Sequence, residues 1–307
     1  MPVSLHDRLV VAVASSALFD LSESDLVFRE RGVSAYREHQ REHEHDVLNP
    51  GVAFPLIRRL LALNGPEDDH IVEVVLLSRN DPDTGMRVFN SIEQHGLPIS
   101  RAAFVEGRDP FAYMKAFNAS LFLSANVDDV RRAVRHGLPA GQVFPTAFVD
   151  NEEDLELRLA FDFDGIIADD SAEKVFKTKD LKAFHSNERE HALEPLKAGP
   201  LQRFFSEVAA LQSLERDRQE RDPAYQRRLR IAIVTARNAP AHTRVITTLR
   251  DWGIHVNEAF FLGGLDKSEI LGAFRPHIFF DDQLTHVEGA SRVVPSVHVP
   301  FGVANTR

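Results

Sequence analysis

The sequence predicts an α/β protein made of two tandem, doubly wound units, each with a parallel sheet. Short, continuous apolar runs alternate with amphipathic helical segments, which is the order of parallel strands joined by helical crossovers. Related motifs also recur in the two halves of the 307 residues at fixed offsets. The length suits about two domains, and the composition, 43% hydrophobic and 27% charged, is ordinary for a globular protein.

Six buried strands are predicted from apolar runs that are bounded by polar residues or glycine. They cover residues 9–14, 72–77, 121–123, 157–161, 231–234 and 278–280. Between them, residues 243–252 place their apolar side chains on one helical face, and Gly253 ends the predicted helix. Residues 85–95, followed by Gly96, show the same pattern. These elements predict a Rossmann-like order of strands and helices in each half.

The two halves resemble each other over most of their length. Residues 36–44 (YREHQREHE) resemble residues 184–192 (FHSNEREHA), 148 residues later, and residues 76–80 (LLSRN) resemble residues 233–237 (IVTAR), 157 residues later. The nine extra residues fit the charged segment 215–228, which reads as a solvated helix end and loop. We therefore expect one unit in residues 1–150 and a second in residues 151–307, joined near the acidic stretch 150–156.

Two carboxylates follow the predicted strand 157–161. Asp162 and Asp164 are two residues apart, so they point to the same side where the strand ends, and Gly165 then allows a sharp turn. Oxygen ligands at the end of a parallel strand suit Mg²⁺ and a phosphoryl group. A calcium loop is excluded, because Ile166 stands where that motif requires Asp or Asn. A surface turn remains the alternative.

Further groups suited to a phosphate site follow the other strands of the second half, at Thr235, Lys267, Asp281 and Asp282. The Thr235 hydroxyl and the backbone N–H groups of Ala236 and Arg237 suit a phosphoryl oxygen, and the Lys267 ammonium suits its charge. The aspartate pair adds oxygen ligands for Mg²⁺. Each residue alone also has a structural explanation, as a helix N-cap, a solvated charge or a turn.

Residues 162–165 (DFDG), Thr235, Lys267 and the pair Asp281-Asp282 together resemble the four motifs of the haloacid dehalogenase superfamily of phosphotransferases. The resemblance implies haloacid dehalogenase-type units with a small helical cap insert after the first strand, at about residues 168–201 in the second unit. It also implies that Asp162 is the nucleophile that forms an aspartyl-phosphate, and that Asp164 protonates the leaving oxygen and later activates water.

The same resemblance implies that Thr235 and Lys267 hold the phosphoryl group. Mg²⁺ would bind Asp162, the backbone carbonyl of Asp164 and Asp281, with Asp282 as a further carboxylate. A carboxylate that attacks a phosphate dianion needs this charge neutralisation, which a metal ion and an ammonium group supply.

More narrowly, nearly the full chain resembles the cytosolic 5′-nucleotidase type I family. The resemblance lies in residues 12–19 (AVASSALF), 191–201 (HALEPLKAGPL), 234–237 (VTAR) and 275–283 (RPHIFFDDQ). The first motif departs from the D-G-D of animal members, which affects substrate preference more than reaction type. The resemblance implies Mg²⁺-dependent hydrolysis of nucleoside 5′-monophosphates in the cytoplasm. The alternatives are a phosphatase for another small phosphate ester and a nucleotide-binding regulator without turnover.

The first half lacks the ionisable groups of this predicted site. At the offsets of the repeat, the six positions Asp162, Asp164, Thr235, Lys267, Asp281 and Asp282 correspond to Ala14, Ser16, Ser78, Pro110, Ser124 and Ala125. We therefore predict one active site per chain, in the second half. The first half is then a degenerate, catalytically inert unit.

Each half carries an insert after its first strand. In the second, His185, Asn187, Arg189 and His191 are available to meet a nucleoside, although a helix with a polar face is the favoured interpretation. In the first, His39 and His43 have the i, i+4 spacing of a zinc pair, but the charged neighbours favour a solvated helix.

Several classes of partner are excluded by composition. The formal net charge of −10 argues against a nucleic-acid groove, and the absence of cysteine excludes thiolate sites. No apolar run approaches the about 18 residues that span a membrane. Residues 8–19 resemble a signal peptide, but a second copy of the pattern in mid-chain favours a buried strand. We expect a nucleoside monophosphate partner, and a homo-oligomer stays open.

Overall fold

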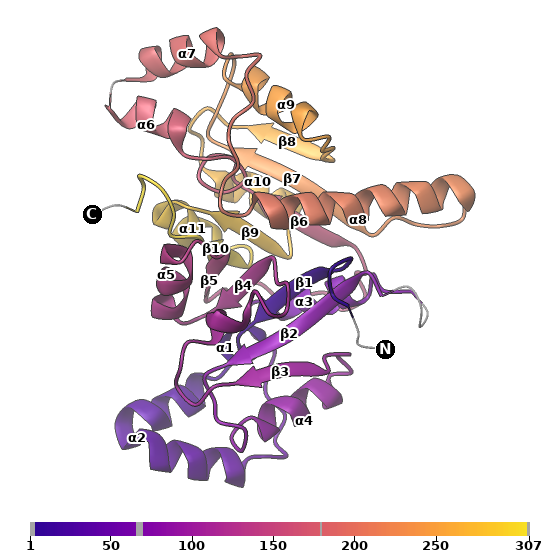
Figure 1. Ribbon diagram of the computed structural model, residues 1–307, viewed down its shortest axis with the longest axis vertical. Coiled ribbons are helices and arrows are strands. Elements are labelled where there is room, and N and C mark those ends of the chain that lie inside the picture. The colour runs from indigo at the N-terminus through magenta and orange to yellow at the C-terminus, as the bar shows by residue number, and fades with distance from the viewer. Residues whose placement is uncertain (1–3, 66–69, 179, 306–307) are drawn as a thin grey trace. The chain divides into compact units, whose positions relative to one another are not determined.

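The computed structural model describes residues 4–65, 70–178 and 180–305. The chain forms two compact units, residues 1–143 (unit 1) and 144–307 (unit 2), and each is an α/β unit with helices packed on a parallel sheet (Figure 1). This confirms the predicted α/β class with parallel strands.

The strands of unit 1 pair in the order β3-β2-β1-β4-β5, and every pair is parallel. The strands are β1 (Leu9–Val13), β2 (Val72–Ser78), β3 (Arg101–Phe104), β4 (Leu121–Ser124) and β5 (Ala140–Phe144). The helices are α1 (Ser15–Leu18), α2 (Ser22–Glu42), α3 (Phe54–Leu61), α4 (Met86–Gln94), the 3-10 helix η1 (Pro110–Tyr113) and α5 (Val127–Arg135). The first strand lies in the middle of its sheet, so the chain winds outward on both sides of it.

Unit 2 has the equivalent order, β8-β7-β6-β9-β10, again with parallel pairs. The strands are β6 (Leu157–Phe161), β7 (Leu229–Thr235), β8 (Glu258–Phe261), β9 (Ile278–Asp281) and β10 (Ser296–His298). The helices are α6 (Ser171–Thr178), α7 (Leu181–Glu190), α8 (Gln202–Arg221), α9 (His242–Asp251), α10 (Lys267–Phe274) and α11 (Leu284–Ala290). The central strand β6 is the one that leads to Asp162.

All six predicted strands are confirmed, as β1, β2, β4, β6, β7 and β9. The two predicted helices, at residues 85–95 and 243–252, are confirmed as α4 and α9. Sequence analysis missed β3, β5, β8 and β10, which have three to five residues each. Since β3 and β8 are sheet edges with only half-buried residues, they lack the continuous apolar run of a central strand.

Both faces of the unit 2 sheet are covered. On one face, Ala232 and Val234 of β7 pack in a buried cluster with Leu271 of α10 and Ala290 of α11. The other face carries buried aromatic rings: Phe161 stacks on Phe280 at 5.0 Å and meets Phe205 of α8 edge-on at 5.1 Å. Phe161 and Phe280 directly precede Asp162 and Asp281, so aromatic packing fixes the strand ends that carry these aspartates.

The insert after the first strand is a bent pair of helical segments in each unit. In unit 1, α2 is broken at Gly32, whose φ of 79° is left-handed. In unit 2, the corresponding insert is divided into α6 and α7, and Asp180 caps the start of α7 (Figure 1). Gly32 and Asp180 are 148 residues apart, so the two breaks fall at equivalent positions.

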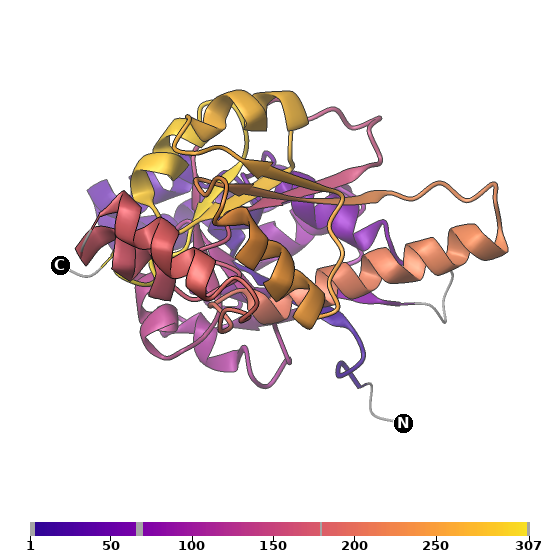
Figure 2. The same cartoon turned by 90° about the horizontal axis from the view of Figure 1, so that it is seen from above.

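The extra residues of unit 2 lie in and after α8. This helix ends at Arg221 and its last part projects beyond the sheet in both views (Figures 1 and 2). Glu215 accepts hydrogen bonds from the backbone N–H groups of Arg228 and Leu229, at 2.9 Å each, and so ties the loop to the start of β7. The prediction of a helix end and loop in residues 215–228 is confirmed.

Residues 8–19 contain the buried strand β1, as predicted, and also the short helix α1, which was not predicted. Within the part of the chain that the structure describes, no helix is long and apolar enough to cross a membrane.

Candidate active site

The predicted site residues of the second half meet at the carboxyl edge of the unit 2 sheet. Asp162 follows β6, while Thr235 and Asp281 end the strands on either side of it, β7 and β9. Lys267 is the first residue of α10. Adjacent parallel strands bring their carboxyl ends together, and this places polar groups far apart in sequence at one point.

Lys267 joins two of the aspartates. Its Nζ lies 3.0 Å from Asp162 Oδ1 and 2.7 Å from Asp281 Oδ2, and all three side chains are buried. Burial alone would lower the pKa of Lys267, but the two carboxylates raise it, so the ammonium stays charged. Asp281 Oδ2 also accepts a hydrogen bond from His286 Nδ1 at 3.2 Å.

The buried aspartates differ in pKa. Burial raises the pKa of Asp162 to about 7, opposed by Lys267 and reinforced by Asp281. Burial also acts to raise the pKa of Asp281, but Lys267 and His286 outweigh it and hold that pKa below its usual value. Of the two carboxyl groups that contact Lys267, that of Asp281 is therefore the more readily ionised.

Asp282 is the unsatisfied member of the cluster. Its side chain is buried, and among the described residues neither carboxylate oxygen has a hydrogen-bond partner. Burial, followed by the charges of Asp162 and Asp281, raises its pKa to about 10. Gly165, at φ +72°, passes so close that a Cβ there would lie 2.5 Å from Asp282 Oδ2. The glycine of the D-x-D-G motif thus leaves room for this carboxylate.

Three of these carboxyl groups fit a divalent cation. Asp162, Asp281 and Asp282 each offer an oxygen, and these oxygens lie within 4.8 Å of one another. Buried carboxylate oxygens without partners are rare in proteins unless an ion or water satisfies them. Hard oxygen ligands of this kind suit Mg²⁺ or Ca²⁺. The donor set therefore fits a metal ion.

Asp164 lies in a separate ion-pair network, in which it is itself only partly buried. Arg237 donates from Nε and NH2 to the two oxygens of Asp164, at 2.6 and 2.7 Å, and from NH1 to Glu188 of α7. Glu188 also pairs with Arg244 of α9 at 3.0 Å, and its side chain is fully buried. The carboxylates raise the pKa of Arg237 against the effect of burial. The network joins the D-x-D-G loop to the insert.

Comparison with known proteins agrees with the resemblance drawn from the motifs. A family model described as 5′-nucleotidase matches residues 1–306. The chain belongs to the 5′-nucleotidase family. It is 33% identical over 299 residues to cytosolic 5′-nucleotidase 1B of Homo sapiens. The aligned region covers 95% of this chain and 48% of that protein. The chain thus spans about half the length of this relative. No solved structure matches the chain.

In this member of the 5′-nucleotidase family, the predicted phosphate-binding residues Ala236 and Arg237 differ from each other: Ala236 is exposed, whereas the Arg237 side chain is buried. The Arg237 side chain is turned inward to Asp164 and Glu188, and its backbone N–H lies 3.2 Å from Thr235 Oγ1. Of the loop after β7, the backbone of Ala236 and the hydroxyl of Thr235 are thus the groups available to a ligand.

The four polar residues singled out in the insert of this 5′-nucleotidase family member do not form one cluster. His185 Nε2 lies 3.1 Å from Asn238 Oδ1, and Asn187 donates to Glu188 at 3.1 Å. His191 donates from Nδ1 to the backbone oxygen of Asn187, and Arg189 is exposed. The segment is the helix α7, as the favoured interpretation expected.

Three functional candidates were missed by sequence analysis: Glu188, Arg244 and His286. A signal for the first existed in the repeat, since Glu188 stands where the first half has Gln40. Arg244 corresponds to Arg87, which donates to Gln40 at 3.1 Å just as Arg244 donates to Glu188. At this position unit 2 thus has a negative charge where unit 1 has a neutral amide.

The histidine pair of unit 1 has a third neighbour. Ligand atoms of His39, His43 and Glu23 lie within 4.8 Å of one another. However, His43 Nδ1 donates to the His39 backbone oxygen at 2.8 Å, which is the contact that His191 makes in unit 2 with Asn187. This contact is therefore a feature of the fold at the end of the insert.

Proposed function

We propose that unit 2 hydrolyses nucleoside 5′-monophosphates to nucleoside and phosphate through an aspartyl-phosphate. The observation that carries the proposal is the convergence at one strand edge of Asp162, Lys267, Asp281 and Asp282, the last without a hydrogen-bond partner among the described residues. Membership of the 5′-nucleotidase family supports both the reaction and the substrate class.

In the first step, Asp162 attacks phosphorus, the new bond joins its carboxylate oxygen to phosphorus, and the bond to the 5′-oxygen breaks. Lys267, fixed by two carboxylates, neutralises the transferring group, and the Thr235 hydroxyl binds one of its oxygens. In the second step, water attacks phosphorus and the bond to Asp162 breaks. The products are nucleoside, inorganic phosphate and the original carboxylate.

Asp162, Asp281 and Asp282 would hold a divalent metal ion, which we propose to be Mg²⁺. The backbone carbonyl of Asp164 is a further ligand in this proposal. A bound metal ion supplies positive charge that lets one carboxylate approach a phosphate dianion. It also gives the buried oxygens of Asp282 the partner that they lack in the described part of the protein.

Asp164 is proposed as the group that moves protons. It protonates the leaving 5′-oxygen and later accepts a proton from the attacking water. Since both of its oxygens accept hydrogen bonds from Arg237, it must give up part of this pair to reach the leaving oxygen. Glu188 and Arg244 keep Arg237 in place meanwhile, so we assign these two as positioning residues.

We propose further that the two units are tandem haloacid dehalogenase-type domains, each with a cap insert, and that unit 1 is catalytically inert. Repeated hydrogen bonds support the duplication. Ser91 Oγ accepts from Leu48 N at 3.0 Å, and Thr248 Oγ1 accepts from Leu196 N at 3.0 Å. The name of the human relative supports a cytoplasmic location.

A phosphate-release assay tests the proposed function. Purified protein is given a panel of nucleoside 5′-monophosphates and sugar phosphates, with Mg²⁺ or with EDTA. We expect release from nucleotides only, and only with Mg²⁺. Asp162→Asn should lower release by at least about a thousandfold, because it removes the nucleophile. Asp217→Asn, at an exposed position of α8, is the matched control and should keep full activity.

Each other outcome has a defined meaning. Release chiefly from sugar phosphates supports a phosphatase for another small ester, and nucleotide binding without release supports a regulator. Substantial Mg²⁺-dependent release by Asp162→Asn protein would contradict the assignment of unit 1 as inert.

A further inference from the structure

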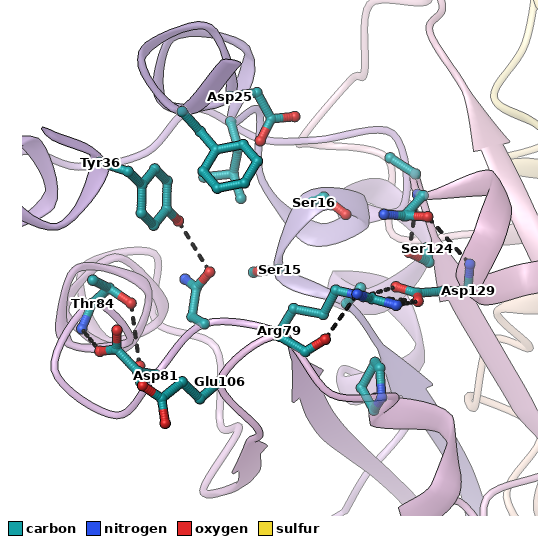
Figure 3. Close-up of a pocket in the computed structure, with 18 of the residues that line it drawn as sticks. Ser15, Ser16, Asp25, Tyr36, Arg79, Asp81, Thr84, Glu106, Ser124 and Asp129 are labelled. Carbon is teal, nitrogen blue, oxygen red and sulfur yellow. Dashed lines mark hydrogen bonds and ion pairs between the residues drawn. The ribbon is translucent and has the colours of Figure 1, made fainter. Parts of the chain in front are cut away.

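Unit 1 keeps a pocket where unit 2 has its candidate active site. The pocket has a volume of about 690 Å³ and lies at the carboxyl edge of the unit 1 sheet. Its lining includes the counterparts of five site residues, namely Ala14, Ser16, Pro110, Ser124 and Ala125. Figure 3 shows Ser16, Ser124 and Tyr36 around this space. The volume is that of a small-molecule site.

The charges of the pocket disfavour a phosphate. Arg79 is held by Asp129 through Nε at 2.8 and 2.9 Å, and it also donates to the Gly107 backbone oxygen (Figure 3). Arg37 pairs with Asp81 and Glu106 at 2.8 Å each. Carboxylates outnumber guanidinium groups in the lining, five to three. A dianion would therefore meet excess negative charge, and two of the three guanidinium groups, those of Arg37 and Arg79, are already paired.

Neutral polar groups also line the pocket. Tyr36 donates to Asn80 Oδ1 at 3.0 Å and accepts from Gln40 at 2.9 Å (Figure 3). The Nδ2 of Asn80 is buried and, within the described ranges, has no hydrogen-bond partner. A buried amide donor without a partner is costly, and a ligand oxygen in the pocket would satisfy it. Asn80 stands where unit 2 has Arg237, so a charged group has been exchanged for a neutral donor.

One wall of the pocket is apolar and exposed to a ligand. Phe28 and Val33 of α2 line the pocket although 48% and 53% of their surface is exposed. The Phe28 ring meets Tyr36 edge-on at 6.0 Å, which fixes its orientation. An exposed aromatic face beside neutral hydrogen-bond donors suits a flat ring that carries hydroxyl groups.

We propose that this pocket of unit 1 binds a neutral nucleoside. Its ring packs on Phe28, and Asn80, Tyr36 and Ser16 bind its polar atoms. The pocket retains the position of the unit 2 site but has lost the lysine and the four aspartates of that site, so it suits the part of a nucleotide that remains after hydrolysis. The choice of a nucleoside among neutral ring compounds rests on the proposed function, whereas the pocket and its charge do not.

Isothermal titration with adenosine, guanosine, cytidine and uridine tests the proposal on the full chain. Phe28→Ala should weaken the affinity of the best nucleoside about tenfold or more, because it removes the stacking surface. Leu26→Ala is the matched control, since Leu26 is 54% exposed on the same helix and does not line the pocket. Its affinity should equal that of the wild type. Val33→Glu provides a second, exposed substitution that should also weaken binding.

The proposal is overturned if no nucleoside binds with a dissociation constant below about 1 mM. It is overturned equally if Phe28→Ala and Val33→Glu bind as the wild type does, since binding then lies elsewhere, as in unit 2. Adenosine 5′-monophosphate that competes as well as adenosine for the Phe28-dependent site would refute the argument from charge. Phosphate release is measured separately, so a protein without activity that still shows Phe28-dependent binding refutes the proposed function and not the pocket.

Discussion

The ion-pair network beneath the candidate site gives the sharpest stability prediction. Glu188 accepts hydrogen bonds from Arg237, Arg244 and Asn187, and its side chain has no exposed surface. Glu188→Gln keeps the size of the side chain but removes its charge. Arg237 then keeps Asp164 as its counter-charge, Arg244 loses the carboxylate with which it pairs, and a buried amide N–H faces a guanidinium.

Removing one partner from a buried ion pair typically costs about 3–5 kcal/mol. Arg237 keeps both hydrogen bonds to Asp164, and Gln retains one acceptor oxygen, so we expect about 2–4 kcal/mol here. The free energy of unfolding of unit 2 should fall by this amount. Urea denaturation followed by fluorescence measures it, because the one tryptophan of the chain, Trp252, is the C-cap of α9 in unit 2.

Glu190→Gln is the control for this experiment, since Glu190 is exposed on the same helix. Its stability should stay within about 0.5 kcal/mol of the wild type. A Glu188→Gln variant that matches this control would refute the reasoning, because the network would then contribute no more than a surface pair.

Three further predictions concern the metal cluster. Burial raises the pKa of the Asp282 carboxyl to about 10, so folding at pH 7 to 8 without metal requires this group to take up a proton. Asp282→Asn removes this cost, and the variant should therefore be about 2–4 kcal/mol more stable than the wild type under these conditions. This gain should fall as the pH is lowered and vanish below about pH 3, where the carboxyl is protonated in both the folded and the unfolded state. Thermal denaturation with and without Mg²⁺ should also show that the variant has lost its response to the metal. In the wild type, the Mg²⁺-induced rise in melting temperature should shrink between pH 8 and pH 6, because protons occupy Asp162, whose pKa is about 7, and compete with the metal; a constant rise would contradict this. Gly165→Ala places a methyl group 2.5 Å from Asp282 Oδ2 at φ +72°, so it should lower phosphate release at least about tenfold and cost about 1–2 kcal/mol, whereas Gly272→Ala, with nothing within 4 Å, should do neither.

The central strands and the residues that end them were predictable because both follow local rules. An apolar run predicts a buried strand, and parallel strands place Asp162, Thr235 and Asp281 together without knowledge of any contact. The edge strands β3 and β8 lack such a run, because only part of each residue is buried.

The network around Arg237 could not be predicted in the same way. Its partners Asp164 and Glu188 lie 73 and 49 residues away along the chain, and the choice between facing a phosphate and facing inward is made by the fold. In the segment of α7, four polar side chains looked as suitable as Glu188. Burial distinguishes it from them, and burial depends on the packing of α7 against α9.

The different lengths of α3 and α8 have a consequence for rebuilding unit 1. The nine-residue difference between the units falls between the start of α8 and the start of β7, that is, in and after α8. At the carboxyl edge, the spacing from β1 to Gly51 equals that from β6 to Gly199, and the spacing from Ser78 to Ser124 equals that from Thr235 to Asp281. The segment from the start of α8 to β7 has thus diverged in length, whereas the spacing of residues along the carboxyl edge is unchanged. A graft of the proposed centre into unit 1 would thus combine the exchanges A14D, S16D, S78T, P110K, S124D and A125D with A17G, because Ala17 stands where Gly165 leaves room for Asp282.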